Sequence, residues 1–276
     1  MFSDSMKKTK IIVNLLLMIF IIGLIFSVYK IITWQKDNKA INRQLENINK
    51  SVKINEVEDN NNAEIIEQQE EIPKSNPYWD YIKMNLIDVD FNELKKTNKE
   101  VKGWIQVNGT NINYPFVQTT NNEYYLTRAF NKSYNDAGWI FLDYRNNIET
   151  LDKNTIIYGH SRLDQTMFGT LKNITKNNWY NDSNNYIIKL STQAHNTLWQ
   201  VFSVYIIETT SDYLKISFDS GTEFLNFAKM LMNRSKFDFN TSINENDRIV
   251  TLSTCYNDNK KVVMHAKLIK IENKNT

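Results

Sequence analysis

Cys255 is the residue whose type and position most clearly suggest covalent chemistry. It follows the apolar, β-branched run RIVTLST (248–254), which is typical of a buried strand, and polar loop residues come directly after it. A thiol at the end of a strand is held by the sheet and stays accessible. A single cysteine forms neither an internal disulfide nor a multi-thiolate zinc site. Cys255 is therefore either a small buried hydrophobe or a reactive thiol, and its position favours the reactive thiol.

A cysteine nucleophile needs a nearby base, because the thiolate is the attacking form. The sequence offers three histidines. His160 follows the apolar run TIIYG, so it also stands where a strand gives way to a loop. His195 lies in the polar turn QAHN, and His265 lies inside the last apolar run, where a hydrogen-bonded sheet histidine is the favoured interpretation. His160 is the best partner for Cys255.

This pair predicts acyl transfer. A thiolate attacks a carbonyl, an imidazole protonates the departing amine, and the resulting thioester is resolved by water or by another amine. The sequence leaves hydrolysis and transfer both open. The oxyanion of the tetrahedral intermediate needs a hydrogen-bond donor, and Lys261 opens the strand that follows Cys255. Alternation along that strand places its residues on two faces: Lys261, Val263, His265 and Lys267 on one, Val262, Met264, Ala266 and Leu268 on the other.

Eight short apolar runs predict the strands that position these residues. They are GWIQV (103–107), INYPFVQ (112–118), GWIFL (138–142), TIIYG (155–159), NYIIKL (185–190), LWQVFSVYIIE (198–208), RIVTLST (248–254) and KVVMHAKLIKI (261–271). Two modest helices are expected at 78–87 and 91–101, and an amphipathic helix at 222–233 between the sixth and seventh strands. Many short strands with few helices favour a mainly antiparallel sheet closed into a barrel.

The N-terminal part has a different composition. Residues 11–29 are almost all apolar, which is about the length that crosses a bilayer. Lysines directly before this run predict a cytoplasmic N-terminus: Lys7, Lys8 and Lys10. A cleaved signal peptide is the alternative, but no small-residue cleavage site follows. We therefore expect a cytoplasmic segment (1–10), a transmembrane anchor (11–32), a helical or disordered stalk (33–77) and an extracellular catalytic domain (78–276).

Charge and composition exclude several classes of function. The formal net charge is +2, with 33 basic and 31 acidic residues, so no broad basic surface for nucleic acid is expected. The sequence contains no Gly-rich phosphate loop, and no cluster of ligands predicts a metal ion or an organic cofactor. A composition that is 41% hydrophobic is sufficient for a globular core.

The motifs together resemble those of the sortase family. The resemblance rests on TLSTC, IIYGH, the short cation-led strand after the cysteine and the N-terminal anchor; INYPFVQ, GWIFLDYRN and the TMF after YGH are similar to class B. It covers about residues 78–271 and implies an eight-stranded closed barrel with N-terminal helices and a helix between strands six and seven. It also implies a transpeptidase on the outer face of a Gram-positive cell membrane.

The resemblance further implies the substrates. A class B-like sortase would cut the cell-wall sorting signal of a secreted surface protein after Thr, with an NPxT-type motif, and would transfer the acyl group to an amine of a peptidoglycan precursor. Two other functions stay open: a catalytically weak relative that binds sorting signals, and a hydrolytic cysteine peptidase.

The resemblance assigns catalytic roles to His160 and Cys255. The family has an arginine at the start of the strand after the cysteine, and in this sequence Lys261 stands there, with Lys260 before it. Lysine keeps the charge but lacks the planar fork of donors. Arg162 and Arg248 are conceivable substitutes. The implied peptide-binding residues are Leu126, Thr209, Tyr213, Leu214 and Ser253.

Overall fold

The computed structural model describes residues 2–57, 63–66 and 72–274, and it divides the chain into two compact units. The first unit ends at Glu46, and the second begins at Asn47. Helix α1 (Phe2–Ser51) makes up the first unit and continues a few residues into the second. Each unit is described separately below.

In the described part of the chain, α1 is the one helix long and apolar enough to cross a membrane. Its apolar window is not buried inside the protein, and side chains such as Phe20 and Phe26 are exposed. The helix contains the predicted anchor (11–32) and continues into the predicted stalk (33–77). Of that stalk, residues 58–62 and 67–71 lie outside the described residues.

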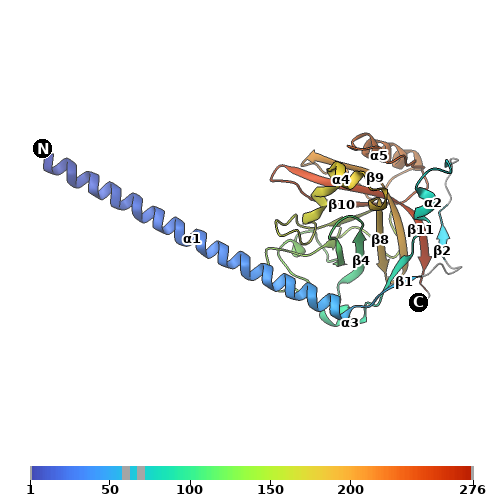
Figure 1. Cartoon of the computed structure of the whole chain (residues 1–276), viewed down its shortest axis with the longest axis horizontal. Helices are drawn as coiled ribbons and strands as arrows, with labels where there is room; N and C mark the ends of the chain where they lie inside the picture. The colour runs from blue at the N-terminus through green and yellow to red at the C-terminus, as the bar shows by residue number, and fades with distance from the viewer. Residues whose placement is uncertain (1, 58–62, 67–71, 275–276) are drawn as a thin grey trace. The chain divides into compact units, whose positions relative to one another are not determined.

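The second unit is built on a closed sheet of eight strands (Figure 1). These are β4 (Val101–Val107), β5 (Asn113–Val117), β6 (Phe141–Leu142), β7 (Asn154–Tyr158), β8 (Ile187–Thr192), β9 (His195–Glu208), β10 (Ile249–Cys255) and β11 (Lys260–Asn273). Their order is β10-β7-β6-β5-β4-β8-β9-β11, and β11 pairs back onto β10, which closes the barrel. The predicted eight-stranded fold and all eight strand positions are confirmed.

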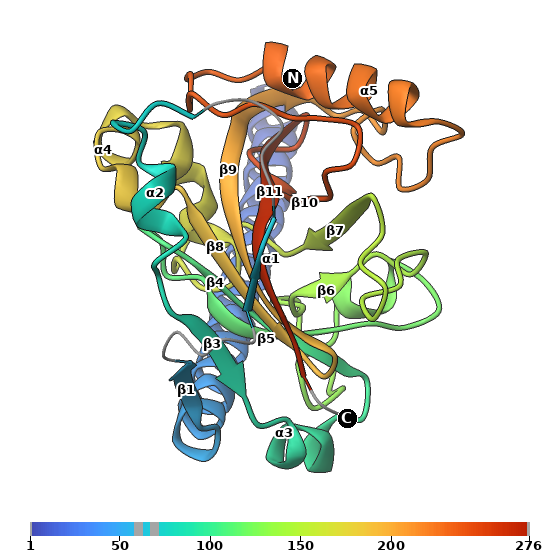
Figure 2. The same ribbon diagram turned by 90° about the vertical axis from the view of Figure 1, so that its right-hand side faces the viewer.

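Most neighbours in the barrel are antiparallel, but β7 with β10 and β5 with β6 are parallel. The long strands β9 and β11 run side by side across the barrel (Figure 2), with two register shifts that bend them. Three tryptophans fill the interior and are fully buried: Trp104, Trp139 and Trp199. Burial of large rings of this kind dominates the stability of a core.

The region before the barrel differs in part from the expectation. The helix predicted at 78–87 is a single turn, α2 (Tyr78–Tyr81), because Leu86, Ile87 and Val89 form strand β3 (Leu86–Val89) instead. Strand β3 pairs with β1 (Ile54–Val57), and β2 (Ala63–Ile65) pairs with Lys270–Glu272 of β11, beyond Lys267, which lies opposite the first residue of β10. Strands β1 and β2 lie in the segment for which the sequence predicted helix or disorder. The second predicted helix is α3 (Asn92–Thr97).

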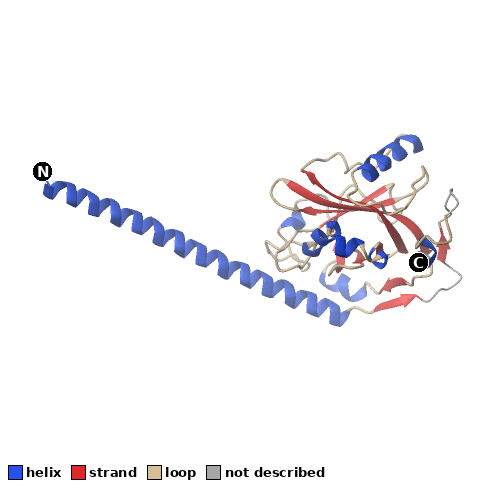
Figure 3. Ribbon diagram, turned by 45° about the horizontal axis from the view of Figure 1, so that its top comes forward, coloured by secondary structure: helices blue, strands red, loops and turns tan. Residues whose placement is uncertain are grey.

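The remaining helical segments surround the sheet (Figure 3). They are η1 (Tyr124–Leu126), η2 (Gly169–Thr175), α4 (Asn177–Tyr180), η3 (Ser183–Asn185) and α5 (Gly221–Asn233). Helix α5 lies between β9 and β10 in sequence, as predicted for strands six and seven, and it packs against β9. Its buried residues are those of the predicted amphipathic stripe: Phe224, Phe227, Ala228 and Leu231.

The N-terminus of α5 is capped by Ser220, whose Oγ accepts a hydrogen bond from the Glu223 amide at 3.1 Å. We expect Ser220→Ala to lower the free energy of unfolding by about 1 kcal/mol, because that amide then loses its partner. Urea unfolding of the full-length chain in detergent micelles measures this. Ser217→Ala is the control: Ser217 is exposed, and its side chain makes no hydrogen bond within the described residues. Equal stability losses in both variants would contradict the capping role.

Candidate active site

The parallel pair β7 and β10 brings Cys255 and His160 to the same edge of the barrel. Ser253 lies opposite Tyr158 in this ladder, so the two chains leave it together, with Cys255 and His160 each two residues further on. A hydrogen bond of 2.7 Å from Thr254 Oγ1 to the Gly159 carbonyl continues the contact beyond the ladder. Cys255 is exposed, and His160 is half-buried. The sheet therefore fixes the backbone on which each side chain is carried.

Lys261 contacts the thiol directly. In the antiparallel hairpin of β10 and β11, Cys255 lies opposite Lys261, and Lys261 Nζ is 3.0 Å from Cys255 Sγ. Directly opposite residues in a sheet carry their Cβ atoms about 5 Å apart, so the contact follows from the register. The neighbouring Lys260 instead pairs with the exposed Glu208 across 3.3 Å. Strand alternation thus separates the two lysines, as the sequence predicted.

His160 is held by the backbone of the segment before β6. Its Nε2 lies 2.8 Å from the Leu126 carbonyl oxygen. A carbonyl accepts and does not donate, so Nε2 carries the proton, and Nδ1 is the ring nitrogen left for proton transfer. Gly138 has φ of +60°, and a Cβ there would lie 2.7 Å from His160 Cδ2 and 2.9 Å from the Leu126 carbonyl oxygen. The close approach of imidazole and backbone therefore requires glycine at 138.

A cavity of about 580 Å³ opens beside Cys255. All five residues that the sequence predicted for peptide binding line it, together with Cys255 and Lys261: Leu126, Thr209, Tyr213, Leu214 and Ser253. Among the described residues that line this cavity, Lys261 is the one with a charged side chain. The structure thus brings the five predicted binding residues together with Cys255 and Lys261, whereas His160 does not line this cavity. Their role in binding stays a prediction.

Two of these residues contact each other. The Tyr213 hydroxyl lies 3.0 Å from Ser253 Oγ, and both residues are buried. Burial, with a smaller contribution from the nearby Cys255, raises the pKa of the Tyr213 phenol above its ordinary value. The phenol therefore stays protonated, and the pair forms a neutral polar floor under the cavity.

Sequence reasoning missed half of the lining. The missed residues are Asn122, Phe141, Tyr158, Gly159, Thr210, Ser211 and Thr254. Gly159 and Thr254 are next to predicted residues along the chain, and Tyr158 lies opposite Ser253 in the β7–β10 ladder, so their positions carried a signal. Thr210 and Ser211 belong to an irregular segment with no periodic pattern.

The other candidate side chains are engaged elsewhere. His265 is fully buried between the Thr251 hydroxyl (2.9 Å to Nδ1) and the Tyr205 hydroxyl (2.8 Å to Nε2), and burial lowers its pKa to about 3. This matches the predicted sheet histidine.

His195 opens β9, and its ring nitrogens lie 2.9 Å from Asn273 Oδ1 and 2.6 Å from the Glu149 carbonyl oxygen. The sequence predicted a residue in a polar turn, and the structure shows that both ring nitrogens have partners. Arg162 pairs with Asp164, and Arg248 donates to the Leu151 carbonyl. The cavity at Cys255 is lined by none of these four residues: His195, Arg162, Arg248 and His265. Within the described residues, no group of three metal-ligating side chains is present.

Comparison with known proteins agrees with this geometry. The Sortase domain family matches residues 105–269, more than half of the chain. Sortase B of Staphylococcus aureus is 35% identical over 185 residues, which cover 66% of this chain and 75% of that protein.

Two solved structures are similar over 65% of this chain. A Staphylococcus aureus sortase B–substrate complex has a TM-score of 0.61, 35% identity and 84% of that chain covered. A sortase B complexed with triglycine has a TM-score of 0.62, 35% identity and 85% of that chain covered. The thiol, the histidine at the end of the neighbouring strand and the closed eight-stranded barrel thus occur in a chain that belongs to the sortase family of cysteine transpeptidases, which anchor proteins to the cell wall.

Proposed function

We propose that this chain cleaves an NPxT-like sorting signal after Thr and passes the acyl group through a Cys255 thioester to an amine of a peptidoglycan precursor. The observation that carries the proposal is the exposed thiol of Cys255, in contact with the Lys261 ammonium, at the mouth of a 580 Å³ cavity. An extended peptide in this cavity would present its carbonyl to the sulfur.

The first half of the reaction forms the thioester. The Cys255 thiolate attacks the Thr carbonyl carbon, and a C–S bond forms as the carbonyl becomes an oxyanion. The scissile C–N bond then breaks, and the His160 imidazolium donates its proton to the leaving amine. The second half reverses these roles: an acceptor amine attacks the thioester, His160 takes its proton, and the C–S bond breaks to return the thiolate.

Lys261 has two electrostatic tasks in this scheme. Before substrate binds, its ammonium lies 3.0 Å from the sulfur, where it stabilises a thiolate by a charge-assisted contact. Once the sulfur has bonded to carbon, the negative charge moves to the carbonyl oxygen, and a flexible ammonium can follow it. An arginine would offer two parallel donors to the same oxygen region, so lysine supplies the charge with less geometric control.

The substrate assignment draws on the relatives. A Staphylococcus aureus sortase B has been solved with substrate, and a sortase B has been solved with triglycine, a peptide with a free amine. The cavity here is lined mostly by apolar and neutral polar side chains, which suits a short uncharged motif. We infer that peptide and amine approach Cys255 from this cavity and from the exposed side of the thiol.

Helix α1 would anchor the enzyme in the cell membrane as a single span, with the N-terminus cytoplasmic and the catalytic unit outside. The apolar length of α1 and the lysines that precede residues 11–29 support this orientation. The sorting signals of secreted proteins and the peptidoglycan precursor would then meet on the outer face.

The proposed roles of Cys255 and His160 give the first prediction for activity. Cys255→Ala should abolish cleavage of an NPxT peptide, because no nucleophile remains. His160→Ala should lower the rate by about 10²–10⁴-fold, the usual contribution of a general acid and base. His195→Ala is the control and should cleave at the wild-type rate.

Mass spectrometry of the full-length enzyme in detergent should detect the acyl adduct on Cys255, and added triglycine should yield the ligated peptide. Loss of activity in His195→Ala equal to that in His160→Ala would overturn the choice of base. Release of hydrolysed peptide alone, with triglycine present, would indicate a hydrolytic peptidase.

Lys261 makes the second prediction. Removal of one preorganised donor costs about 10²–10³ in rate, so Lys261→Ala should slow acylation by that order. Lys260→Ala should have little effect, because Lys260 pairs with Glu208 at the surface. Lys261→Arg should be at least as active as the natural enzyme, because it restores a bidentate fork. Single-turnover acylation of these three variants and of Arg162→Ala measures this. Equal rates for Lys260→Ala and Lys261→Ala, with Arg162→Ala inactive, would move the role to Arg162.

Topology makes the third prediction. In protoplasts of a Gram-positive host that produces the full-length chain, external protease should remove the catalytic unit, because α1 would place it outside. A cytoplasmic reporter protein is the control and should stay intact. If the catalytic unit survives in intact protoplasts and is digested only after lysis, the orientation is the reverse.

A further inference from the structure

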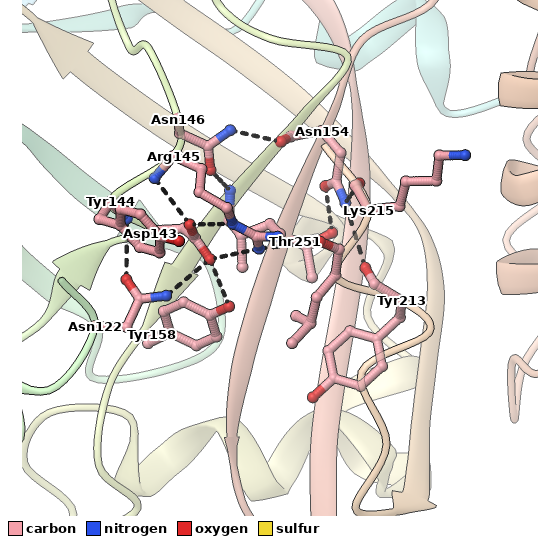
Figure 4. Close-up of polar contacts among 12 residues, drawn as sticks. Asn122, Asp143, Tyr144, Arg145, Asn146, Asn154, Tyr158, Tyr213, Lys215 and Thr251 are labelled. Carbon is pink, nitrogen blue, oxygen red and sulfur yellow. Dashed lines mark hydrogen bonds and ion pairs between the residues drawn. The ribbon is translucent and has the colours of Figure 1, made fainter. Parts of the chain in front are cut away.

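Asp143 is a buried charge for which the reaction above has no use. It follows β6 directly, is fully buried and does not line the cavity. Its Oδ1 accepts from the backbone amide (3.0 Å) and Nε (2.8 Å) of Arg145. Its Oδ2 accepts from Arg145 Nη2 (2.8 Å), the Tyr158 hydroxyl (2.9 Å) and Asn122 Nδ2 (3.0 Å), as Figure 4 shows. One carboxylate thus joins three side chains from three segments of the chain.

Each of these donors lines the cavity or hydrogen-bonds to a residue that does, and each does so at a different segment of the chain. Asn122 and Tyr158 line the cavity themselves, the first from the segment before η1 and the second from the end of β7. Arg145 contacts a third lining segment, residues 209–215, which we call the Leu214 wall: its Nη2 also donates to the Leu214 carbonyl oxygen at 3.1 Å. Asp143 therefore does not line the cavity itself but connects three of the segments that do, two directly and one through Arg145.

The backbone of the Leu214 wall is held by hydrogen bonds from side chains. Residues 209–220, between β9 and α5, form no strand or helix, so ladder hydrogen bonds do not fix them. Asn154 donates from Nδ2 to the carbonyls of Tyr213 (3.3 Å) and Lys215 (2.8 Å), and the Thr251 hydroxyl donates to Asn154 Oδ1 at 2.6 Å. Arg145 donates to the Leu214 carbonyl, so three successive carbonyls of this wall accept side-chain hydrogen bonds; Figure 4 shows those from Asn154.

The charge of Asp143 matters for this arrangement. Burial alone would favour the neutral acid, but the hydrogen bonds from Arg145, Tyr158 and Asn122 outweigh it and hold the pKa of Asp143 below its ordinary value. Burial and the charge of Asp143 raise the pKa of Tyr158, so the phenol stays a donor. A neutral amide at 143 would present an NH₂ group to some of these donors and could not accept from all of them.

We propose that Asp143 is a positioning residue that sets the shape of the peptide groove by holding Asn122, Tyr158 and, through Arg145, the Leu214 wall. The use of the cavity as a peptide groove rests on the proposed function. The nucleophile and its partners depend on other contacts: Cys255 and Lys261 on the β10–β11 hairpin, and His160 on the Leu126 carbonyl. Asp143 therefore controls binding of the peptide more than the reactivity of the thiol.

Asp143→Asn and Arg145→Gln in the full-length chain in detergent micelles test this proposal. Both variants should speed amide hydrogen exchange in residues 209–215. Both should raise KM about tenfold, with kcat changed less, for a peptide that contains Asn-Pro-Ala-Thr and continues beyond the Thr. The rate of Cys255 alkylation by iodoacetamide should stay at the wild-type value, because that small reagent does not need the groove. Arg145→Lys keeps the charge but not the fork, so its KM should lie between those of wild type and Arg145→Gln.

Asp247→Asn is the matched control. Asp247 is also a buried carboxylate, with Lys267 Nζ 3.9 Å away, and its Oδ2 accepts from the Asn244 amide; neither Asp247 nor these two partners line the cavity. This variant should lose stability with KM and exchange in 209–215 unchanged. If Asp143→Asn behaves in the same way, or if it slows alkylation as much as peptide cleavage, Asp143 is not a groove-positioning residue. If Asp143→Asn does not fold, the two Arg145 variants decide by the same criteria.

Amide exchange separates this inference from the proposed substrate. If wild-type enzyme does not cleave the Asn-Pro-Ala-Thr peptide, the assigned motif is wrong, and exchange in residues 209–215 still reports whether Asp143 holds the wall. Unchanged exchange in both Asp143→Asn and Arg145→Gln would reject the positioning role whatever the peptide result.

Discussion

The pairing of β10 on both of its sides is the constraint on which the rest of this structure depends. On one side β10 runs parallel to β7, and on the other it forms an antiparallel hairpin with β11. The first pairing aligns the ends that carry Cys255 and His160, and the second places Lys261 opposite the thiol. A one-residue slip in either ladder would turn alternate side chains to the other face, and the buried apolar faces of all three strands oppose such a slip. The same core burial that stabilises the barrel therefore fixes the reactive geometry.

Lys261 places an ammonium 3.0 Å from Cys255 Sγ. The resemblance to sortases implies an arginine at this position, and here a more compact and flexible cation lies beside the sulfur. The other described residues that line the cavity are uncharged. In the proposed reaction, a flexible ammonium beside the sulfur follows the negative charge from the sulfur to the carbonyl oxygen. An arginine would trade that mobility for two fixed hydrogen bonds.

The sequence predicted the positions of side chains best where those residues belong to a regular strand. Strand alternation predicted that Lys261 and Lys260 separate, and the apolar runs predicted all eight strands of the barrel. The pattern failed at 78–87, where a single turn of helix precedes strand β3, because a short apolar stretch does not distinguish helix from strand. It also gave no sign of β1 and β2, whose pairing partners are far along the chain. The resemblance to a family, more than periodicity, located Thr209 and Leu214 at the cavity.

The residues proposed for catalysis are positioned by strands, whereas part of the proposed peptide-binding lining lies in an irregular segment. Cys255, Lys261 and the backbone that leads to His160 belong to strands, and their positions follow from ladders that any barrel of this topology must form. The wall formed by residues 213–215 has no ladder, so its shape depends on donors from Arg145 and Asn154. Changes in those donors can alter the groove while the strands keep the thiol in place. Under the proposed function, a change in these donors alters the peptide that the cavity accepts and leaves the acyl-transfer residues in place, because the two sets of residues depend on different hydrogen bonds.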